Sequence, residues 1–219
     1  PYRRQRQMCI RDRGQTMEQY AKTIYRRIFS KLKPPPEMKM SDWADQYRRL
    51  SQGASAEPGR WRTEKVPHQK EIMDTIADVK VKKVVVMSSA QIGKTEGAVL
   101  NTIGYYMHYD PAPVLIMQPT IQMAEAFSKD RLSKMLQDTP VLSGLVNDKG
   151  RNTGNTILQK IFPGGHITMV GANSPSSLAS RPIQILLADE VDRYPATAGK
   201  EGDPLFLASE RLTTFWNSK

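Results

Sequence analysis

The strongest chemical signal in the sequence is a short segment that could bind phosphate groups, made of Ser88, Ser89, Ala90, Gln91, Ile92, Gly93, Lys94 and Thr95. It fits the Walker A pattern G-x-x-x-x-G-K-[ST], except that Ser88 replaces the first glycine. In such a loop, backbone N–H groups at a helix start bind the phosphates, Lys94 neutralises the β- and γ-phosphate oxygens, and Thr95 offers its hydroxyl to Mg²⁺. The sequence therefore predicts an ATP-binding loop over residues 88–95; the alternative is a chance Gly-Lys-Thr at a helix start.

Two adjacent carboxylates, Asp189 and Glu190, follow the apolar run 185–188. At the carboxyl end of a parallel strand beside a phosphate loop, Asp189 could hold Mg²⁺ through water. Glu190 could then polarise the water that attacks the γ-phosphate. The alternative is an exposed acidic turn that caps the strand. The pair and the loop lie about 95 residues apart with strands and helices between them, and together they predict a site that hydrolyses ATP.

Trp61 and Gln69 precede the phosphate loop by about 20–30 residues. The amide of Gln69 could accept from and donate to the adenine edge, and the ring of Trp61 could stack on the base. The sequence thus adds both residues to the predicted ATP-binding set. A surface glutamine and a core tryptophan remain the alternative.

Apolar runs and turn signals predict the elements that would position these residues. We expect strands over 83–88, 113–117 and 183–188, helices over 68–79, 94–106, 121–136 and 205–215, and a hairpin of 156–162 with 166–170. The three strand runs are apolar throughout, which is typical of strands buried on both faces. Strands that alternate with helices predict an α/β fold with a mainly parallel central sheet flanked by helices.

The N-terminal region differs from the rest in charge. Residues 1–60 hold 14 Lys and Arg against 6 Asp and Glu, whereas residues 61–219 hold 18 against 16. We expect residues 1–16 to be a disordered extension that could be non-native, residues 17–60 to be a basic helical arm and linker, and residues 61–219 to be the ATPase domain. The arm could contact a polyanion such as DNA; the alternative is a solvated tail.

Composition excludes several classes of protein. No window reaches the ~18 consecutive apolar residues of a membrane span, and residues 1–13 carry five arginines and no apolar run, unlike a secretory signal. The lone cysteine, Cys9, cannot form an internal disulfide, which fits a reducing compartment. The three histidines, His68, His108 and His166, are too far apart in sequence to suggest a His-based metal site.

Several stretches together resemble the large subunit of lambda-type tailed-phage terminases, the ATPases and nucleases that package DNA. They are residues 34–36, 41–45, 57–61, 67–73, 89–96, 171–175, 180–182, 189–192 and 201–204. The resemblance covers roughly residues 34–219. It implies a P-loop NTPase fold of the RecA-like, additional-strand catalytic-glutamate type, with ATP and Mg²⁺ as cofactors.

The resemblance also implies partners: double-stranded DNA, a terminase small subunit and the portal of a procapsid, with a homo-oligomeric ring during packaging, no membrane, and a place in the host-cell cytoplasm. Many terminases carry an arginine inside the phosphate loop, where this chain has Ala90. Arg181 is therefore the candidate for the charge-stabilising arginine; the alternative is a structural arginine. We expect the coupling motif and the nuclease that cuts concatemeric DNA to lie beyond residue 219.

Two other functions remain open at this stage. A helicase-like P-loop ATPase shares the loop and the Asp-Glu pair, and Gln118-Pro119-Thr120 resembles a helicase motif. Alternatively, the chain binds DNA or a partner protein through its basic arm without turning over ATP. Hydrolysis by the chain, with Lys94→Ala as control, separates the binding fragment from the two ATPases.

Overall fold

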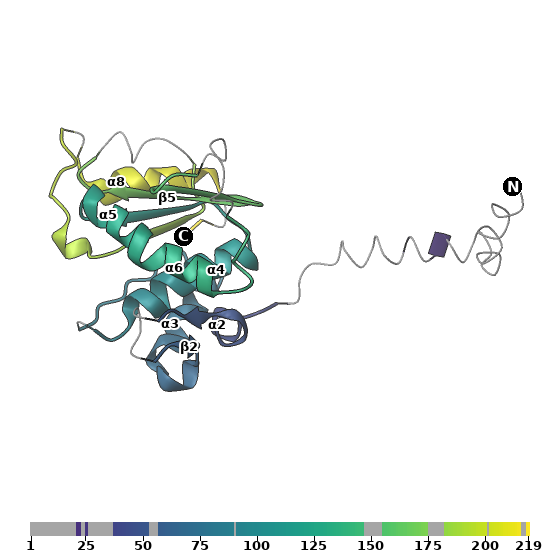
Figure 1. Ribbon diagram of the computed structural model, residues 1–219. Coiled ribbons are helices and arrows are strands. Elements are labelled where there is room, and N and C mark those ends of the chain that lie inside the picture. The colour runs from purple at the N-terminus through teal and green to yellow at the C-terminus, as the bar shows by residue number, and fades with distance from the viewer. Residues whose placement is uncertain are drawn as a thin grey trace, which may run out of the picture. The chain divides into compact units, whose positions relative to one another are not determined.

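The computed structural model (Figure 1) describes residues 21–22, 25, 37–52, 57–89, 91–146, 155–174, 182–200, 202–215 and 218–219. The chain divides into two compact units, Pro1–Glu37 and Met38–Lys219. In the first unit, Ala21, Lys22 and Tyr25 are helical, within the basic helical arm and linker predicted over 17–60. The extension predicted over 1–16 lies outside the described residues. Within the described ranges, no helix combines the length and apolar character that a membrane span requires.

The second unit is built on a four-stranded sheet with the order β4-β5-β3-β6. Its strands are β3 (Val114–Gln118), β4 (Gln159–Phe162), β5 (Gly165–Gly171) and β6 (Ile185–Ala188). β3 pairs in parallel with β5 and β6, whereas β4 and β5 form the predicted antiparallel hairpin, with Gly164 at a φ of 88° in its turn. The α/β class and the mainly parallel sheet are confirmed. Because β3 and β6 are parallel, the segments that follow them start at one edge of the sheet.

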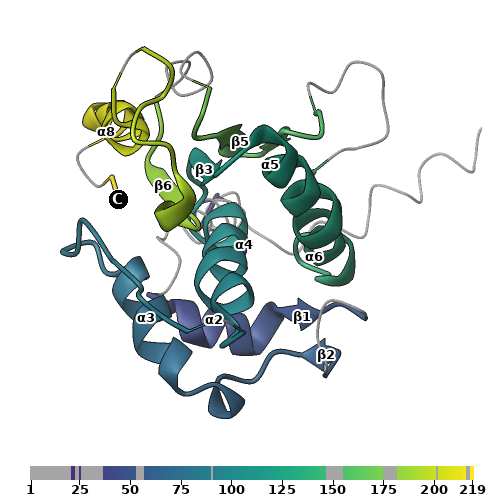
Figure 2. The ribbon, with the colours of Figure 1, turned by 90° about the vertical axis from the view of Figure 1, so that its left-hand side faces the viewer.

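Helices cover both faces of this sheet (Figures 1 and 2). They are α4 (Asn101–His108), α5 (Ile121–Phe127), α6 (Ser133–Asp138) and α8 (Pro204–Ser209). The π-helical segment Thr95–Leu100 leads into α4, the π-helical segment Ser128–Leu132 joins α5 to α6, and the 3₁₀ turn Glu210–Thr214 follows α8. The predicted helices over 94–106, 121–136 and 205–215 are thereby confirmed.

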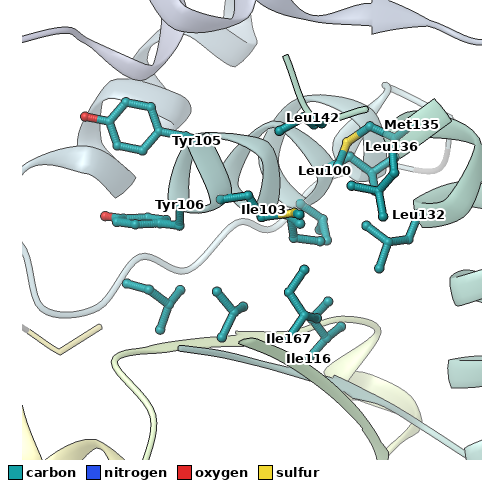
Figure 3. Packing of buried hydrophobic residues seen from close by; sticks show 14 of the residues in the cluster. Leu100, Ile103, Tyr105, Tyr106, Ile116, Leu132, Met135, Leu136, Leu142 and Ile167 are labelled. Atoms are coloured by element: carbon teal, nitrogen blue, oxygen red, sulfur yellow. The ribbon is translucent and has the colours of Figure 1, made fainter. Parts of the chain in front are cut away.

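β3 separates two hydrophobic cores because successive side chains of a strand point to opposite faces. Val114 and Ile116 belong to the larger core, shared with the α4 helix and the α5–α6 pair (Figure 3). Leu115 and Met117 belong to the smaller core, which includes Ala208 of α8. All five residues of β3 are buried, as the unbroken apolar run predicts.

The residues before position 61 contribute to the larger core of the second unit. Helix α2 (Met40–Tyr47) packs on α3 (His68–Ala77) and α4, and a short ladder joins β1 (Arg49–Leu50) to β2 (Gly59–Arg60). Trp43 is fully buried, and its indole N–H donates to Nδ1 of His108 over 3.1 Å. The structure therefore divides the chain after Glu37, whereas the sequence placed the start of the ATPase domain at residue 61.

The strand predicted over 83–88 is wrong. Residues 81–89 have no regular structure, and the side chains of Val85 and Met87 are 78% and 97% exposed. A strand needs a neighbour for its backbone hydrogen bonds. The free edge of β6 is instead occupied by Lys219. Its backbone N–H donates to Gln184 O over 2.8 Å, and its carbonyl accepts from the N–H of Leu186 over 2.7 Å.

Candidate nucleotide site

The phosphate loop turns through two residues of positive φ before its helix begins. Gln91 has a φ of 61° and Gly93 a φ of 80°, a conformation that glycine adopts without steric cost. The backbone N–H of Gly97 donates to Gly93 O over 2.9 Å, so the first helical turn starts directly after the loop. Lys94 and Thr95 thus stand at a helix N-terminus, as the motif requires. Ala90 lies outside the described residues.

Two side chains at the start of α3 bind the loop. The Nε2 of Gln69 donates to Ile92 O over 3.3 Å, and the Nε2 of His68 lies 3.2 Å from the same carbonyl. Gln69 is only 1% exposed, so its side chain reaches the partly buried loop from inside the protein. The segment that contains the predicted adenine-binding glutamine is therefore fixed directly to the phosphate loop.

An ion pair joins the loop to the acidic turn after β6. The Nζ of Lys94 lies 2.9 Å from Oδ1 of Asp189, with side chains that are 32% and 9% exposed. The fold therefore brings together the two motifs that lie far apart in the sequence. Lys94 remains open enough to solvent to contact a phosphate group as well as the carboxylate.

Three donors from the described part of the chain hold the carboxylate of Asp189. Its Oδ1 also accepts from the backbone N–H of Glu190 over 3.1 Å, and its Oδ2 accepts from the Nε2 of Gln118 over 3.3 Å. Gln118 is the last residue of β3 and is 4% exposed. Sequence reasoning placed Gln118 in a helicase-like motif but did not connect it with Asp189, because the contact arises only when β3 and β6 pair.

Glu190 adopts a left-handed conformation, with a φ of 53° and a ψ of 47°. A residue with a side chain rarely adopts this conformation, and such strain clusters at functional sites. Its Oε2 lies 3.1 Å from Nη1 of Arg193, and the Glu190 side chain is 36% exposed. The side chain predicted as the base is thus partly accessible to water, while its buried Oε2 forms an ion pair with the guanidinium of Arg193.

Tyr194 anchors the turn that carries Glu190. Its hydroxyl donates to Met117 O over 2.9 Å, which ties the 3₁₀ turn Val191–Arg193 to the end of β3. Burial, and then the charge of Asp189, raise the pKa of the Tyr194 phenol. The hydroxyl therefore stays protonated at neutral pH and keeps its hydrogen bond.

Glu96, the residue after Thr95, forms ion pairs with two arginines that sequence reasoning missed. The Nη2 of Arg48 lies 2.7 Å from Glu96 Oε2, and the Nη1 of Arg131 lies 3.5 Å from Oε1. The Arg48 side chain is 1% exposed, and burial lowers its pKa to about 10. The phosphate-loop helix is thereby anchored to the β1 segment and to the α5–α6 region. The sequence offered one sign of this role, because Glu96 directly follows Lys94 and Thr95 of the phosphate loop.

One predicted ATP-binding residue, Trp61, stands apart from this cluster. Trp61 is 5% exposed in the larger core, and its indole N–H donates to the Thr63 hydroxyl over 3.0 Å. Its burial supports the alternative of a core tryptophan. Arg181 lies outside the described residues and stays a prediction. Ser88 and Ser89 are exposed at the start of the loop.

The residues present fit a nucleotide with Mg²⁺. Among the residues that the structure describes, the buried Oε1 of Gln69 has no hydrogen-bond partner, and an exocyclic amino group such as that of adenine would supply the missing donor. No group of three or more His, Cys, Asp and Glu side chains that could hold a metal occurs in the part of the chain that the structure describes. One carboxylate from Asp189 and one hydroxyl from Thr95 suit Mg²⁺, which is usually bound by few protein groups together with substrate phosphates.

Comparison with known proteins agrees with this geometry. The sequence matches the family model described as phage terminase large subunit gpA, ATPase domain, over residues 55–219. It is 27% identical over 180 residues to a terminase large subunit of Enterobacteria phage P21, a match that covers 81% of this chain and 28% of that protein. It is 26% identical over 185 residues to that of Escherichia phage lambda, with 84% and 28% covered.

The chain thus spans 28% of the length of these two curated relatives. No solved structure matches the chain. The family model covers the phosphate loop, the acidic pair and Gln118, which are the residues that the fold brings together. The chain belongs to the family of phage terminase large subunits of the gpA type and represents its ATPase domain, whose reaction is the hydrolysis of ATP.

Proposed function

We propose that this chain hydrolyses Mg²⁺-ATP at the Lys94–Asp189 cluster and that the protein uses this energy to move double-stranded DNA into a procapsid. The observation that carries the proposal is the 2.9 Å contact between Lys94 and Asp189. It supports the proposal because Lys94, the lysine proposed to bind phosphate, Asp189, the carboxylate proposed to bind the metal, and the adjacent Glu190 then lie at one edge of the sheet. The finer fold type, RecA-like with an additional strand and a catalytic glutamate, belongs to the same proposal.

Each residue of the cluster has a separate role in the proposed reaction. The backbone N–H groups of residues 88–95 bind the phosphates, and Lys94 neutralises the oxygens on which charge develops. Asp189 and the Thr95 hydroxyl would hold Mg²⁺, which neutralises charge on the β- and γ-phosphates when it is bound. Glu190 accepts a proton from the attacking water, and Arg181 remains the candidate for a charge-stabilising arginine.

The proposed partners are those expected of a terminase large subunit, which is the name that both relatives carry. A terminase large subunit would act with double-stranded DNA, a small subunit and the portal of the procapsid, in the host-cell cytoplasm and as a homo-oligomeric ring. The excess of 14 Lys and Arg over 6 Asp and Glu in residues 1–60 supports contact with the DNA backbone. The nuclease of the complete protein would lie outside the 219 residues.

Phosphate release from Mg²⁺-ATP by this chain, with and without duplex DNA, tests the proposed chemistry. Lys94→Ala should lower turnover by about 10²-fold or more, because the transition-state charge loses its cation. The matched control is Lys134→Ala, since Lys134 is exposed on α6 and remote in sequence from the loop. Equal turnover in the wild type and in Lys94→Ala would show that residues 88–95 are not the phosphate-binding loop of the reaction.

The proposed contact with DNA has its own test. Deletion of residues 1–33 should weaken binding to two unrelated duplexes equally and flatten the salt dependence, because phosphate contacts carry no sequence information. Nucleotide affinity should stay nearly unchanged, since the phosphate loop lies more than fifty residues further along the chain. Unchanged DNA affinity and salt slope after deletion would show that the arm does not contact DNA.

A further inference from the structure

The carboxylate of Asp189 has different partners on its two oxygens. Oδ1 is contacted by Nζ of Lys94 at 2.9 Å and accepts from the backbone N–H of Glu190 at 3.1 Å. Oδ2 accepts from Nε2 of Gln118 at 3.3 Å. A half-turn of the carboxylate about its last bond exchanges two equivalent oxygens and restores the same contacts, whereas an intermediate rotation breaks them. The Gln118 amide donor, on the side opposite Lys94, therefore opposes a change in the plane of the carboxylate.

Gln118 is itself held rigidly. Its backbone carbonyl accepts from the N–H of Ala172 over 2.8 Å, and its Cα pairs in register with Gly171 of β5. The junction is tight, since a Cβ at Gly171 would lie 2.6 Å from the backbone N of Ile121 and 2.7 Å from Oδ1 of Asn173. The amide therefore projects from a central strand whose neighbours on both sides limit its movement.

We propose that Gln118 is a positioning residue for the ATPase reaction: it fixes the plane of the Asp189 carboxylate so that one oxygen faces Lys94 and the phosphate loop while Gln118 holds the other. This inference rests on the proposed function. Loss of a group that hydrogen-bonds to a metal ligand typically lowers metal affinity or activity by about 10- to 100-fold. A purely structural glutamine would instead contribute to folding stability alone, because a buried amide needs partners wherever it lies.

The decisive variant is Gln118→Met, which keeps the length and the unbranched shape of the side chain but removes the N–H donor. The matched control is Gln122→Met, an exposed position on α5 four residues further on. Gln118→Asn, which keeps an amide but is one methylene shorter, is measured in parallel and replaces the methionine variant if that protein does not fold.

Three readouts separate positioning from stability. Thermal unfolding without ligands reports folding, titration of a fluorescent ATP analogue in EDTA and in graded Mg²⁺ reports binding without turnover, and phosphate release gives kcat and KM. We expect Gln118→Met to leave the EDTA affinity within about 2-fold, to raise the Mg²⁺ concentration at half-maximal binding about 10-fold, and to lower kcat about 10- to 100-fold with a smaller change in KM. Gln122→Met should match the wild type.

Unchanged Mg²⁺ dependence and kcat in a folded Gln118→Met protein would overturn the inference, even if its melting temperature fell. Failure of the proposed function looks different: the wild type itself would then show no Mg²⁺-dependent nucleotide binding, or Lys94→Ala would not alter it. A wild type that binds and hydrolyses, together with a Gln118→Met protein that is equal to it, leaves the proposed function standing and removes only the role of Gln118.

Discussion

The Nζ of Lys94 lies 2.9 Å from Oδ1 of Asp189, whereas the next residue along, Glu190, points its carboxylate at Arg193 with a separation of 3.1 Å. Two adjacent acids therefore have different cationic partners. Asp189 is nearly buried beside the loop lysine, and Glu190 is 36% exposed on a strained turn. This separation predicts different consequences for the loss of either charge.

Glu190→Gln should keep the binding of ATP and Mg²⁺ but lower hydrolysis by ~10²-fold or more, because only the base is lost. Asp189→Asn should instead weaken Mg²⁺-dependent nucleotide binding. Nucleotide titrations with and without Mg²⁺, together with phosphate release, measure both effects. Asp192→Asn, at an exposed position in the same turn, is the control. Identical behaviour of the Asp189 and Glu190 variants would contradict the division of roles.

Gly97→Ala should weaken nucleotide binding without weakening the fold. A Cβ at Gly97 would lie 2.5 Å from Oε1 of Gln69, so this flexible side chain must move away from its position beside the loop. Alanine is also the better helix former by about 1 kcal/mol. Nucleotide affinity and melting temperature should therefore change in different directions.

Gly104→Ala in the following helix is the matched comparison. There the added Cβ would collide with the fully buried ring of Trp43, so unfolding should become easier by about 1–3 kcal/mol while the affinity of the folded protein stays the same. A loss of affinity in Gly104→Ala equal to that in Gly97→Ala would show that Gln69 has no special part in binding.

Arg48→Met should lower the free energy of unfolding by about 2–4 kcal/mol, because the nearly buried carboxylate of Glu96 then loses its closest cation and keeps the weaker contact with Arg131. Arg131→Met should cost less than about 1 kcal/mol, since Arg131 is 44% exposed and 3.5 Å from Glu96. Urea denaturation measures both. The double variant Arg48→Met with Glu96→Gln should be less destabilised than the sum of its two single variants; strict additivity would mean that the pair is not coupled.

His108 should make the fold sensitive to mild acid. Burial lowers its pKa, and its Nδ1 accepts from the indole of Trp43 only while unprotonated. The unfolded chain, with a histidine pKa of about 6.5, therefore binds the proton first. Stability is retained above that value and is lost as the pH falls through it toward the lower folded pKa.

His108→Phe, which keeps an aromatic ring beside Tyr47, should show a smaller drop in melting temperature between pH 7.5 and pH 5.5 than the wild type. Burial also raises the pKa of Asp110, which favours the folded state on acidification, but that contribution is common to both proteins. Parallel pH profiles for the two would exclude His108 as the source of the effect.

The local sequence predicted correctly those strands and helices that have neighbours to pair with or pack against in the folded chain. The strand predicted from the apolar run of β3 is confirmed: β5 and β6 pair with it, and helices cover both faces of the sheet. The equally apolar run around Val85 is not a strand, since an apolar run carries no information on which neighbour would pair with it. Lys94 and Asp189 could be predicted from motif spacing, whereas the contacts of Gln118 and Arg48 depend on pairing and packing between distant segments. For Trp61, the sequence fits both a ring that stacks on the base and a core tryptophan, and only the burial of the side chain distinguishes the two.

The ion pair between Arg48 and Glu96 has a practical consequence for truncation. The family match begins at residue 55, and a chain trimmed to that boundary would lose α2 and β1 together. The side chain of Trp43 would no longer cover Gly104, and Glu96, which directly follows Thr95, would lose its closest cation. We therefore expect a fragment that begins near Met38, where the second compact unit starts, to keep these contacts. Fragments of the ATPase domain that begin later should fold poorly for reasons unrelated to catalysis.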